Sequence, residues 1–460
     1  MALDTLASED TIGTHNPFAS VLDFYAQMVH SFTTSWQSSL SLYGELGSIY
    51  KEMQNQHKTP LSYTTTQGQY QNFMSSQKIR KATLEASLEQ LQLFKTKNGY
   101  IFPEQQRLEN YIRTNLAFTF TFERPEYNIQ QAKEEVIFEG ERMSILKFSP
   151  EDREKQNAEN MYLIAPISGH FPTLLRKTIQ ALIDEGYTVY VTDWKAPLEM
   201  KKGVSTSMDD YTGDITASYE TISSGLTSEE VFDVLAVCQP GPITLSSLAI
   251  AESKTTRKPR SVTLMASPID TSVNPTKVGE VGEAMSPATL RSAQLTSPKS
   301  GIQVYPGTYQ ISNFISANFQ DHFQKYQSLA FSAAPLELEQ EKMLEFYHEY
   351  FAVMDIPYDF FRETVTRVFQ QREWATGKIR YQDELFDLKA ISTPLCIIEG
   401  ENDDICGIGE TQAALHITGQ QVSDANYICV PGAGHYGVFA GKAFRKTVIP
   451  FIERFQNQLS

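Results

Sequence analysis

Three residues carry the side chains of a nucleophile, an orienting acid and a general base, in the chain order Cys238, Asp403 and His435. Cys238 follows the apolar run 231–237 and precedes a stretch predicted to be helical. A nucleophile at such a strand–turn–helix junction is pushed out above a sheet, where a later acid and histidine can activate it. The pattern predicts acyl transfer through a covalent intermediate on the cysteine sulfur.

The turn that carries this cysteine reads Ala236-Val-Cys-Gln-Pro240, whereas the usual serine motif is Gly-x-Ser-x-Gly. Alanine is small enough for a tight turn, and proline suits the first helical turn because its missing N–H has no partner there. Gln239 keeps its main-chain N–H, which we expect to stabilise an oxyanion. Alternatively, Cys238 is a small buried residue at a strand end. The helix that follows it and its two partners favour the nucleophile.

The base and the acid each lie in a glycine-containing loop after an apolar run. His435 stands in Gly432-Ala-Gly-His-Tyr-Gly437, where flanking glycines allow the imidazole to reach the strand tips, although a surface-loop histidine is the alternative. The acid lies in Gly400-Glu-Asn-Asp-Asp-Ile405. We prefer Asp403 because the acid of this motif commonly follows Gly-x-x, which leaves Asp404 as a solvated turn residue.

A further loop, Pro166-Ile-Ser-Gly-His170, follows the predicted strand 161–165. We expect the second oxyanion donor here, from the main-chain amides near Ser168 and Gly169. His170 is interpreted as an architectural or substrate-positioning residue rather than as a second catalytic group.

The remaining cysteines, Cys396, Cys406 and Cys429, are interpreted as structural. No pair has CxxC spacing and no histidine cluster lies near them, so we predict no metal site and no cofactor. Free thiols are typical of a reducing cytoplasm, which is the expected location.

The charge balance argues against two classes of partner. The net charge of −16, from 39 basic and 55 acidic residues, disfavours nucleic acid and anionic lipid, which need basic patches. Residues 1–16 are polar and acidic, so we expect no signal peptide. No uninterrupted apolar run of about 18 residues is present, so no membrane span is expected.

Short apolar runs alternate with helical stretches in the middle and at the end of the chain, which predicts an α/β fold with a mostly parallel sheet covered by helices on both faces. Residues 136–138 and 143–148 are predicted to form a hairpin about Gly140. The further predicted strands are 161–165, 187–191, 231–237, 261–265, 394–399 and 426–430. The predicted helices between and after them are 172–184, 209–222, one that follows Cys238 and ends at about Ala251, and 441–458.

The same pattern divides the chain into four segments. Residues 1–133 form a helical N-terminal extension, with an apolar stripe of period 3.5 from Phe18 to Met53 and a second helix over 69–97. Residues 134–269 and 392–460 form the two parts of the core. The intervening residues, 270–391, are rich in aromatic side chains and are interpreted as a lid, because a long insertion between strands is usually functional.

At these residues the sequence resembles the intracellular polyhydroxybutyrate depolymerases, which are α/β-hydrolases with a Cys-Asp-His triad. The resemblance covers about 124–450 and implies Cys238 as nucleophile, His435 as base and Asp403 as acid. Phe444-Arg445 and Glu280-Val-Gly-Glu283 depart from the family pattern, but neither touches the triad. The resemblance is carried by Ala165–Arg176, Val189–Trp194, Ala236–Pro240, Ser267–Asp270, Asn274–Thr276, Val304–Gly307, Phe346–Tyr350, Gly400–Ile405 and Gly434–Phe439.

The resemblance implies hydrolysis of amorphous poly(3-hydroxybutyrate) at the surface of cytoplasmic storage granules, through an acyl-enzyme on Cys238. The thioester also allows thiolysis, with coenzyme A as the acyl acceptor. Two alternatives stay open: a polyhydroxyalkanoate synthase, although synthases carry Gly-x-Cys-x-Gly, and a catalytically idle granule-coat protein. The intact set of three residues argues against the idle protein.

Overall fold

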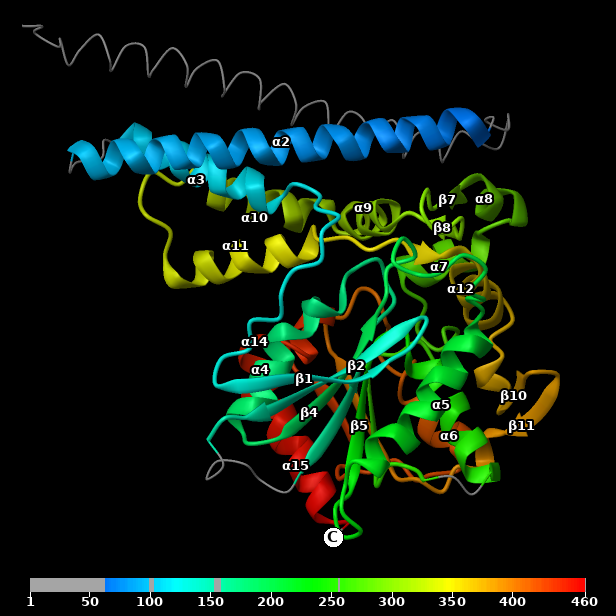
Figure 1. Ribbon diagram of the computed structural model, residues 1–460. Coiled ribbons are helices and arrows are strands. Elements are labelled where there is room, and N and C mark those ends of the chain that lie inside the picture. The colour runs from blue at the N-terminus through cyan, green and yellow to red at the C-terminus, as the bar shows by residue number, and fades with distance from the viewer. Residues whose placement is uncertain (1–62, 99–102, 153–158, 255–256, 460) are drawn as a thin grey trace, which may run out of the picture. The chain divides into compact units, whose positions relative to one another are not determined.

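The central element is an eight-stranded sheet with strand order β1-β2-β4-β3-β5-β6-β12-β13 (Figure 1). The computed structural model describes residues 63–98, 103–152, 159–254 and 257–459. The hairpin strands β1 and β2 pair antiparallel, β2 pairs antiparallel with β4, and the other neighbours are parallel. This is the strand order of the α/β-hydrolase fold, and the predicted fold class is confirmed. The strands are β1 (Ala132–Glu139), β2 (Met143–Pro150), β3 (Asn160–Ile164), β4 (Thr188–Trp194), β5 (Phe232–Val237), β6 (Val262–Met265), β12 (Leu395–Gly400) and β13 (Tyr427–Val430).

The middle strands are buried along their whole length because helices cover both faces of the sheet. Every residue of β3, β4, β5, β6 and β12 is buried. In Figure 1, α5 and α6 lie on one side of the sheet, and α4, α14 and α15 lie on the other. These helices are α4 (Arg176–Asp184), α5 (Met208–Ser224), α6 (Gly241–Lys254), α14 (Gly441–Ala443) and α15 (Ile449–Asn457).

Local sequence explains where several of these helices begin. The 3-10 turn Pro172–Leu175 leads into α4, and Pro172 is the first residue of that 3-10 turn. The Ser207 side chain accepts from the Asp210 amide and Asp210 reciprocates, which forms a capping box at the start of α5. The predicted C-terminal helix 441–458 is present, but a π-helical turn, Phe444–Val448, separates α14 from α15.

The chain between β6 and β12 leaves the sheet and builds a separate helical layer with two small sheets, β7-β8-β9 and β10-β11. Its helices are α7 (Lys277–Ala284), α8 (Pro287–Ser292), α9 (Gly307–Ala317), α10 (Phe319–Ala330), α11 (Leu338–Tyr350), α12 (Tyr358–Glu363), the π-helix η2 (Thr364–Gln370) and two 3-10 turns, Trp374–Thr376 and Leu388–Ala390. Its strands are β7 (Leu295–Thr296), β8 (Gln303–Tyr305), β9 (Ile356–Pro357), β10 (Lys378–Tyr381) and β11 (Glu384–Asp387).

Two N-terminal helices, α2 (Tyr63–Asn98) and α3 (Pro103–Ala117), join this layer. The helix α3 packs against α2, α10 and α11, which Figure 1 shows running beside one another. The contact is aromatic: the rings of Phe118 and Tyr347 are stacked with centroids 4.0 Å apart, and Tyr326 meets Phe118 edge-on at 5.2 Å. The predicted stripe from Phe18 to Met53 lies outside the described residues. In the described part of the chain, no helix is both long and apolar enough to span a membrane.

A buried polar contact joins α2 to the segment that precedes β9. The Tyr70 hydroxyl donates to Asp355 Oδ1 at 2.8 Å, and the Gly307 amide donates to the same oxygen at 3.0 Å. Burial raises the pKa of the Asp355 carboxyl, and these two hydrogen bonds oppose that rise. The contact therefore stabilises the carboxylate where α2 meets α9 and β9.

We predict that Tyr70→Phe lowers the free energy of unfolding by about 1–3 kcal/mol at pH 7, because a buried carboxylate loses a donor. Loss of the donor also raises the pKa of Asp355 in the folded protein further above its value in the unfolded chain. Such a carboxyl destabilises the folded protein when pH keeps it ionised, and ceases to do so when it is protonated. The destabilisation should therefore be smaller at acidic pH. Denaturant unfolding at pH 5 and pH 7 measures both effects.

The matched control is Tyr190→Phe, which removes the hydroxyl of another buried tyrosine, on β4 rather than on α2. An equal loss in the two variants would show that the Tyr70–Asp355 contact has no stabilising effect of its own.

Candidate active site

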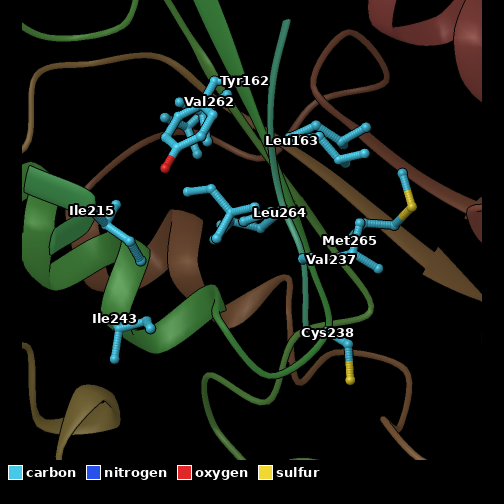
Figure 2. Packing of buried hydrophobic residues seen from close by; sticks show 14 of the residues in the cluster. Tyr162, Leu163, Ile215, Val237, Cys238, Ile243, Val262, Leu264 and Met265 are labelled. Carbon is cyan, nitrogen blue, oxygen red and sulfur yellow. The ribbon is translucent and has the colours of Figure 1, made fainter. Parts of the chain in front are cut away.

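Cys238 directly follows β5 and has a left-handed backbone conformation, with φ of 65°. Such a φ is strained for a residue with a Cβ and is typical of functional turns. The Cys238 amide donates to the Met265 carbonyl at 2.8 Å, and the Gly241 amide donates to the Cys238 carbonyl at 3.1 Å. Figure 2 shows the sulfur directed away from the packed aliphatic side chains at the end of the strand. The geometry is that of a nucleophile elbow.

Gly241, the first residue of α6, was not singled out by the sequence analysis but is essential to this turn. A Cβ at Gly241 would lie 2.4 Å from Ser267 Cβ, so only glycine lets α6 approach the chain that follows β6. The helix begins one residue after Pro240 rather than at it. The glycine that the usual motif carries two residues after the nucleophile is therefore present here three residues after it.

His435 and Asp403 form a buried pair. The His435 Nδ1 atom donates to Asp403 Oδ1 at 3.0 Å and Oδ2 at 2.8 Å, and the two side chains are 4% and 1% exposed. Asp403 Oδ1 also accepts from the amides of Ile405 and Cys406, each at 2.9 Å. Asp404 is exposed and accepts from the Asn318 side chain at 3.1 Å. The structure thus brings Asp403, and not Asp404, to the imidazole.

The two loops that carry this pair are held together at their main chains. The Asn402 amide donates to the Ala433 carbonyl at 2.9 Å. A Cβ at Gly400, the last residue of β12, would lie 2.6 Å from the same carbonyl oxygen. The close approach of the loops after β12 and β13 therefore depends on this glycine, and it places His435 over Asp403.

The electrostatics of the pair favour a charged imidazole. Burial lowers the pKa of His435, but the Asp403 carboxylate and the nearby Cys238 sulfur outweigh burial and hold that pKa well above its ordinary value. An imidazolium beside a thiolate is the charge arrangement that activates cysteine nucleophiles. The three residues are therefore arranged so that a proton can pass from the sulfur to the ring.

Ser168 and Gln239 line the same pocket as Cys238. Among the described residues, neither main-chain amide donates to another main-chain carbonyl. Main-chain N–H groups without such a partner are the donors that an oxyanion needs. The Gln239 side chain also has a structural role that the sequence did not reveal. Its Oε1 accepts from the Ile167 amide at 3.2 Å, and its Nε2 donates to Thr364 Oγ1 at 3.0 Å.

Gly169 and His170 are not among the residues that line the pocket. Gly169 has φ of 92°, and its carbonyl accepts from the Met354 amide at 2.9 Å. His170 is 1% exposed, with its ring centroid 5.0 Å from that of Tyr350. Burial lowers the pKa of His170 to about 3, against a smaller opposing effect of the Tyr350 carbonyl, so its ring is neutral. This position suits the architectural interpretation of His170.

The pocket has a cavity volume of about 80 Å³, which is smaller than the usual small-ligand site. Its floor is formed by residues around the elbow, and its walls are apolar side chains of the segment between β6 and β12. Cys406, which the sequence analysis treated as structural, also lines it. Burial raises the pKa of the Cys406 thiol well above its ordinary value, so Cys406 remains protonated beside Cys238. In the described residues, no group of three or more His, Cys, Asp or Glu side chains is placed to hold a metal ion.

We predict that Asp403→Asn lowers the pKa of His435, because the variant loses the negative charge that raises it. Asp404→Asn should leave that pKa nearly unchanged. Titration of the imidazole resonances of histidine-labelled protein, assigned with His435→Gln, measures both effects. Equal shifts in the two aspartate variants would contradict the orientation seen here.

The C-terminal part of the chain matches a known protein family, and a longer part is similar to two curated proteins. Residues 266–460 match the protein-family model described as "PHB de-polymerase C-terminus". The poly(3-hydroxyalkanoate) polymerase subunit PhaC of Allochromatium vinosum is 24% identical over 293 residues, which covers 62% of this chain and 75% of that protein. The PhaC subunit of Cupriavidus necator is 22% identical over 147 residues, covering 31% of this chain and 24% of that protein.

Among solved structures, a bromoperoxidase from Bacillus anthracis is similar to this chain, with 14% identity and a TM-score of 0.39. That likeness covers 70% of this chain and 99% of the bromoperoxidase. The strand order identifies the chain as an α/β-hydrolase-fold protein. Its C-terminal residues match a depolymerase family model, and its sequence is distantly similar to polymerase subunits.

Proposed function

We propose that this protein hydrolyses an aliphatic polyester of the poly(3-hydroxybutyrate) kind through a thioester on Cys238. The observation that carries the proposal is the strained Cys238 at the end of β5, beside the buried His435–Asp403 pair. A cysteine that only filled space would need neither the left-handed backbone nor a charged partner. The match of residues 266–460 to a depolymerase family supports the choice of substrate.

The reaction would proceed in two acyl-transfer steps. The Cys238 proton passes to His435, and the thiolate attacks the ester carbonyl. The amides of Gln239 and Ser168 stabilise the resulting oxyanion, and the imidazolium protonates the alcohol that leaves. Water then attacks the thioester while His435 takes its proton, which releases the acid and restores the thiol. Asp403 keeps the ring oriented and favours its charged form throughout.

The segments around the core would bring a water-insoluble polymer to this site. In this proposal, residues 270–391 act as a lid over the pocket. The apolar walls of the pocket suit the methylene and methyl groups of an aliphatic hydroxyacid. The protein would act on cytoplasmic granules of amorphous polymer, and coenzyme A would replace water as acceptor if the reaction is thiolytic.

A polymerase is the second candidate, because the distant relatives are PhaC polymerase subunits. The same cysteine, acid and base would then pass the acyl group to a growing chain rather than to water. The turn Ala236-Val-Cys-Gln-Pro240 favours hydrolysis, since synthases carry Gly-x-Cys-x-Gly. The two directions use different acceptors and can be separated by measuring the products.

We predict that the full-length protein releases soluble 3-hydroxybutyrate or its oligomers from amorphous granules, and that Cys238→Ala abolishes release. His435→Gln should lower kcat by about 10²–10⁴-fold, the usual contribution of a general acid–base group. Product analysis with and without coenzyme A distinguishes hydrolysis from thiolysis. In parallel, 3-hydroxybutyryl-coenzyme A is supplied, and free coenzyme A and polymer are measured.

The matched control is Cys429→Ala, which removes a thiol from β13, outside the pocket lining. It should retain full release. Net polymer formation from the thioester would establish the polymerase instead. Granule binding without any Cys238-dependent product would identify an idle coat protein and overturn both enzymatic proposals.

A further inference from the structure

Two elements of the segment between β6 and β12 form one wall of the pocket beside Cys238. Val278 of α7 lines the pocket, and so do Val365 and Phe369 of the π-helix η2. A π-helix is rare and widens the helical turn, and such turns occur frequently at functional sites. Here it directs Thr364, Val365 and Phe369 to the same cavity.

The ring of Phe369 rests on the backbone of α7 at Gly282. A Cβ at Gly282 would lie 2.9 Å from Phe369 Cγ and 3.1 Å from its Cδ2. Any side chain at position 282 would therefore displace the ring or push the two elements apart. Gly282 belongs to the sequence Glu280-Val-Gly-Glu283.

Hydrogen bonds resist separation of α7 from η2. Gln370, next to Phe369, donates from Nε2 to the Met285 carbonyl at 2.8 Å and to the Gly282 carbonyl at 3.3 Å. The Gly282 carbonyl also accepts from the Met285 amide at 3.3 Å, so Gln370 adds side-chain bonds to the C-terminal end of α7. A residue larger than glycine at position 282 would thus move the flexible ring more easily than the paired backbone.

The opposite end of η2 is joined to the nucleophile turn. Thr364 Oγ1 accepts from the Gln239 side chain at 3.0 Å, and Gln239 directly follows Cys238. The π-helix therefore has a defined position relative to the reacting sulfur. An acyl group on Cys238 would share the cavity with the Phe369 ring, and the position of that ring would limit the length of the group.

We propose that Phe369, seated on Gly282, determines the length of the acyl group that Cys238 accepts, and that it favours short hydroxyacids over those with long alkyl side chains. This inference rests on the proposed acyl transfer by Cys238. Three aromatic side chains, Phe314, Phe361 and Phe369, line the cavity and leave it suited to a short aliphatic chain. Of these, only Phe369 lies against a glycine that a single methyl group would convert into a steric obstacle.

Two substitutions test the proposal in opposite directions. Phe369→Ala enlarges the cavity and should raise the ratio of kcat/KM for 4-nitrophenyl octanoate to that for the butyrate by about tenfold. Gly282→Ala pushes the ring toward the cavity and should lower the same ratio by about tenfold. Alanine is intrinsically favourable at a helical glycine, so this variant should fold. Phe369→Leu should give an intermediate ratio.

The control is Phe323→Ala, which removes an exposed aromatic ring of α10 that is not in the pocket lining. Its ratio should equal that of the unaltered protein. Shifts of less than twofold in both test variants, or shifts in the same direction, would overturn the role of Phe369.

A second measurement separates this inference from the proposed reaction. The rates at which N-ethyl and N-octyl iodoacetamide alkylate Cys238 are followed by mass spectrometry, which requires no turnover. If the variants shift this ratio as predicted but no ester is cleaved, the pocket assignment holds and the proposed function fails. If esters are cleaved and neither ratio changes, the proposed function holds and the assignment of Phe369 fails.

Discussion

The left-handed backbone of Cys238 is the constraint on which the rest of the candidate site depends. The chain must leave the buried strand β5 and enter α6 within three residues, and a φ of 65° achieves this with the sulfur directed out of the sheet. Such a conformation costs about 1–3 kcal/mol for a residue with a Cβ. The hydrogen bond from Cys238 to Met265 and the close contact of Gly241 with Ser267 maintain it.

The same sheet provides the partners, because the carboxyl ends of its parallel strands lie along one edge. The loop after β12 carries Asp403, and a buried carboxylate holds that loop: Glu399 accepts from the amides of Gly409, Thr411 and Gln412 at 2.8–2.9 Å. The loop after β13 then lays His435 on Asp403. Mutual attraction in a buried setting keeps the imidazole charged, which a solvent-exposed pair would do only weakly.

The segment between β6 and β12 lines the pocket and also contacts the turn that carries Cys238. Gln239 contacts both the loop at Ile167 and the π-helix at Thr364, so one side chain connects the oxyanion loop, the nucleophile turn and the pocket wall. Changes in the pocket wall that reach Thr364 are therefore expected to affect the turn at Cys238 as well.

The sequence by itself determined the parts of this protein that depend on local pattern. Alternating apolar runs and helical stretches predicted the α/β fold, because burial on both faces requires continuous apolar strands. The position of Cys238 before a helix, and of Asp403 and His435 in loops after strands, follows from the same pattern. The choice of Asp403 over Asp404 rested on spacing and agrees with the observed hydrogen bonds, while the catalytic roles remain a prediction.

Only the tertiary structure decided features that involve residues far apart in the chain. Cys406 lies in the pocket because the loop after β12 folds toward Cys238. Its sequence position after the acid loop separates it from the strand cysteines Cys396 and Cys429, but does not place it beside Cys238. The need for glycine at 241 and 282 arises from Ser267 and Phe369, which are 26 and 87 residues away. Distances of that kind are set by packing between elements, and no periodicity within a single element encodes them.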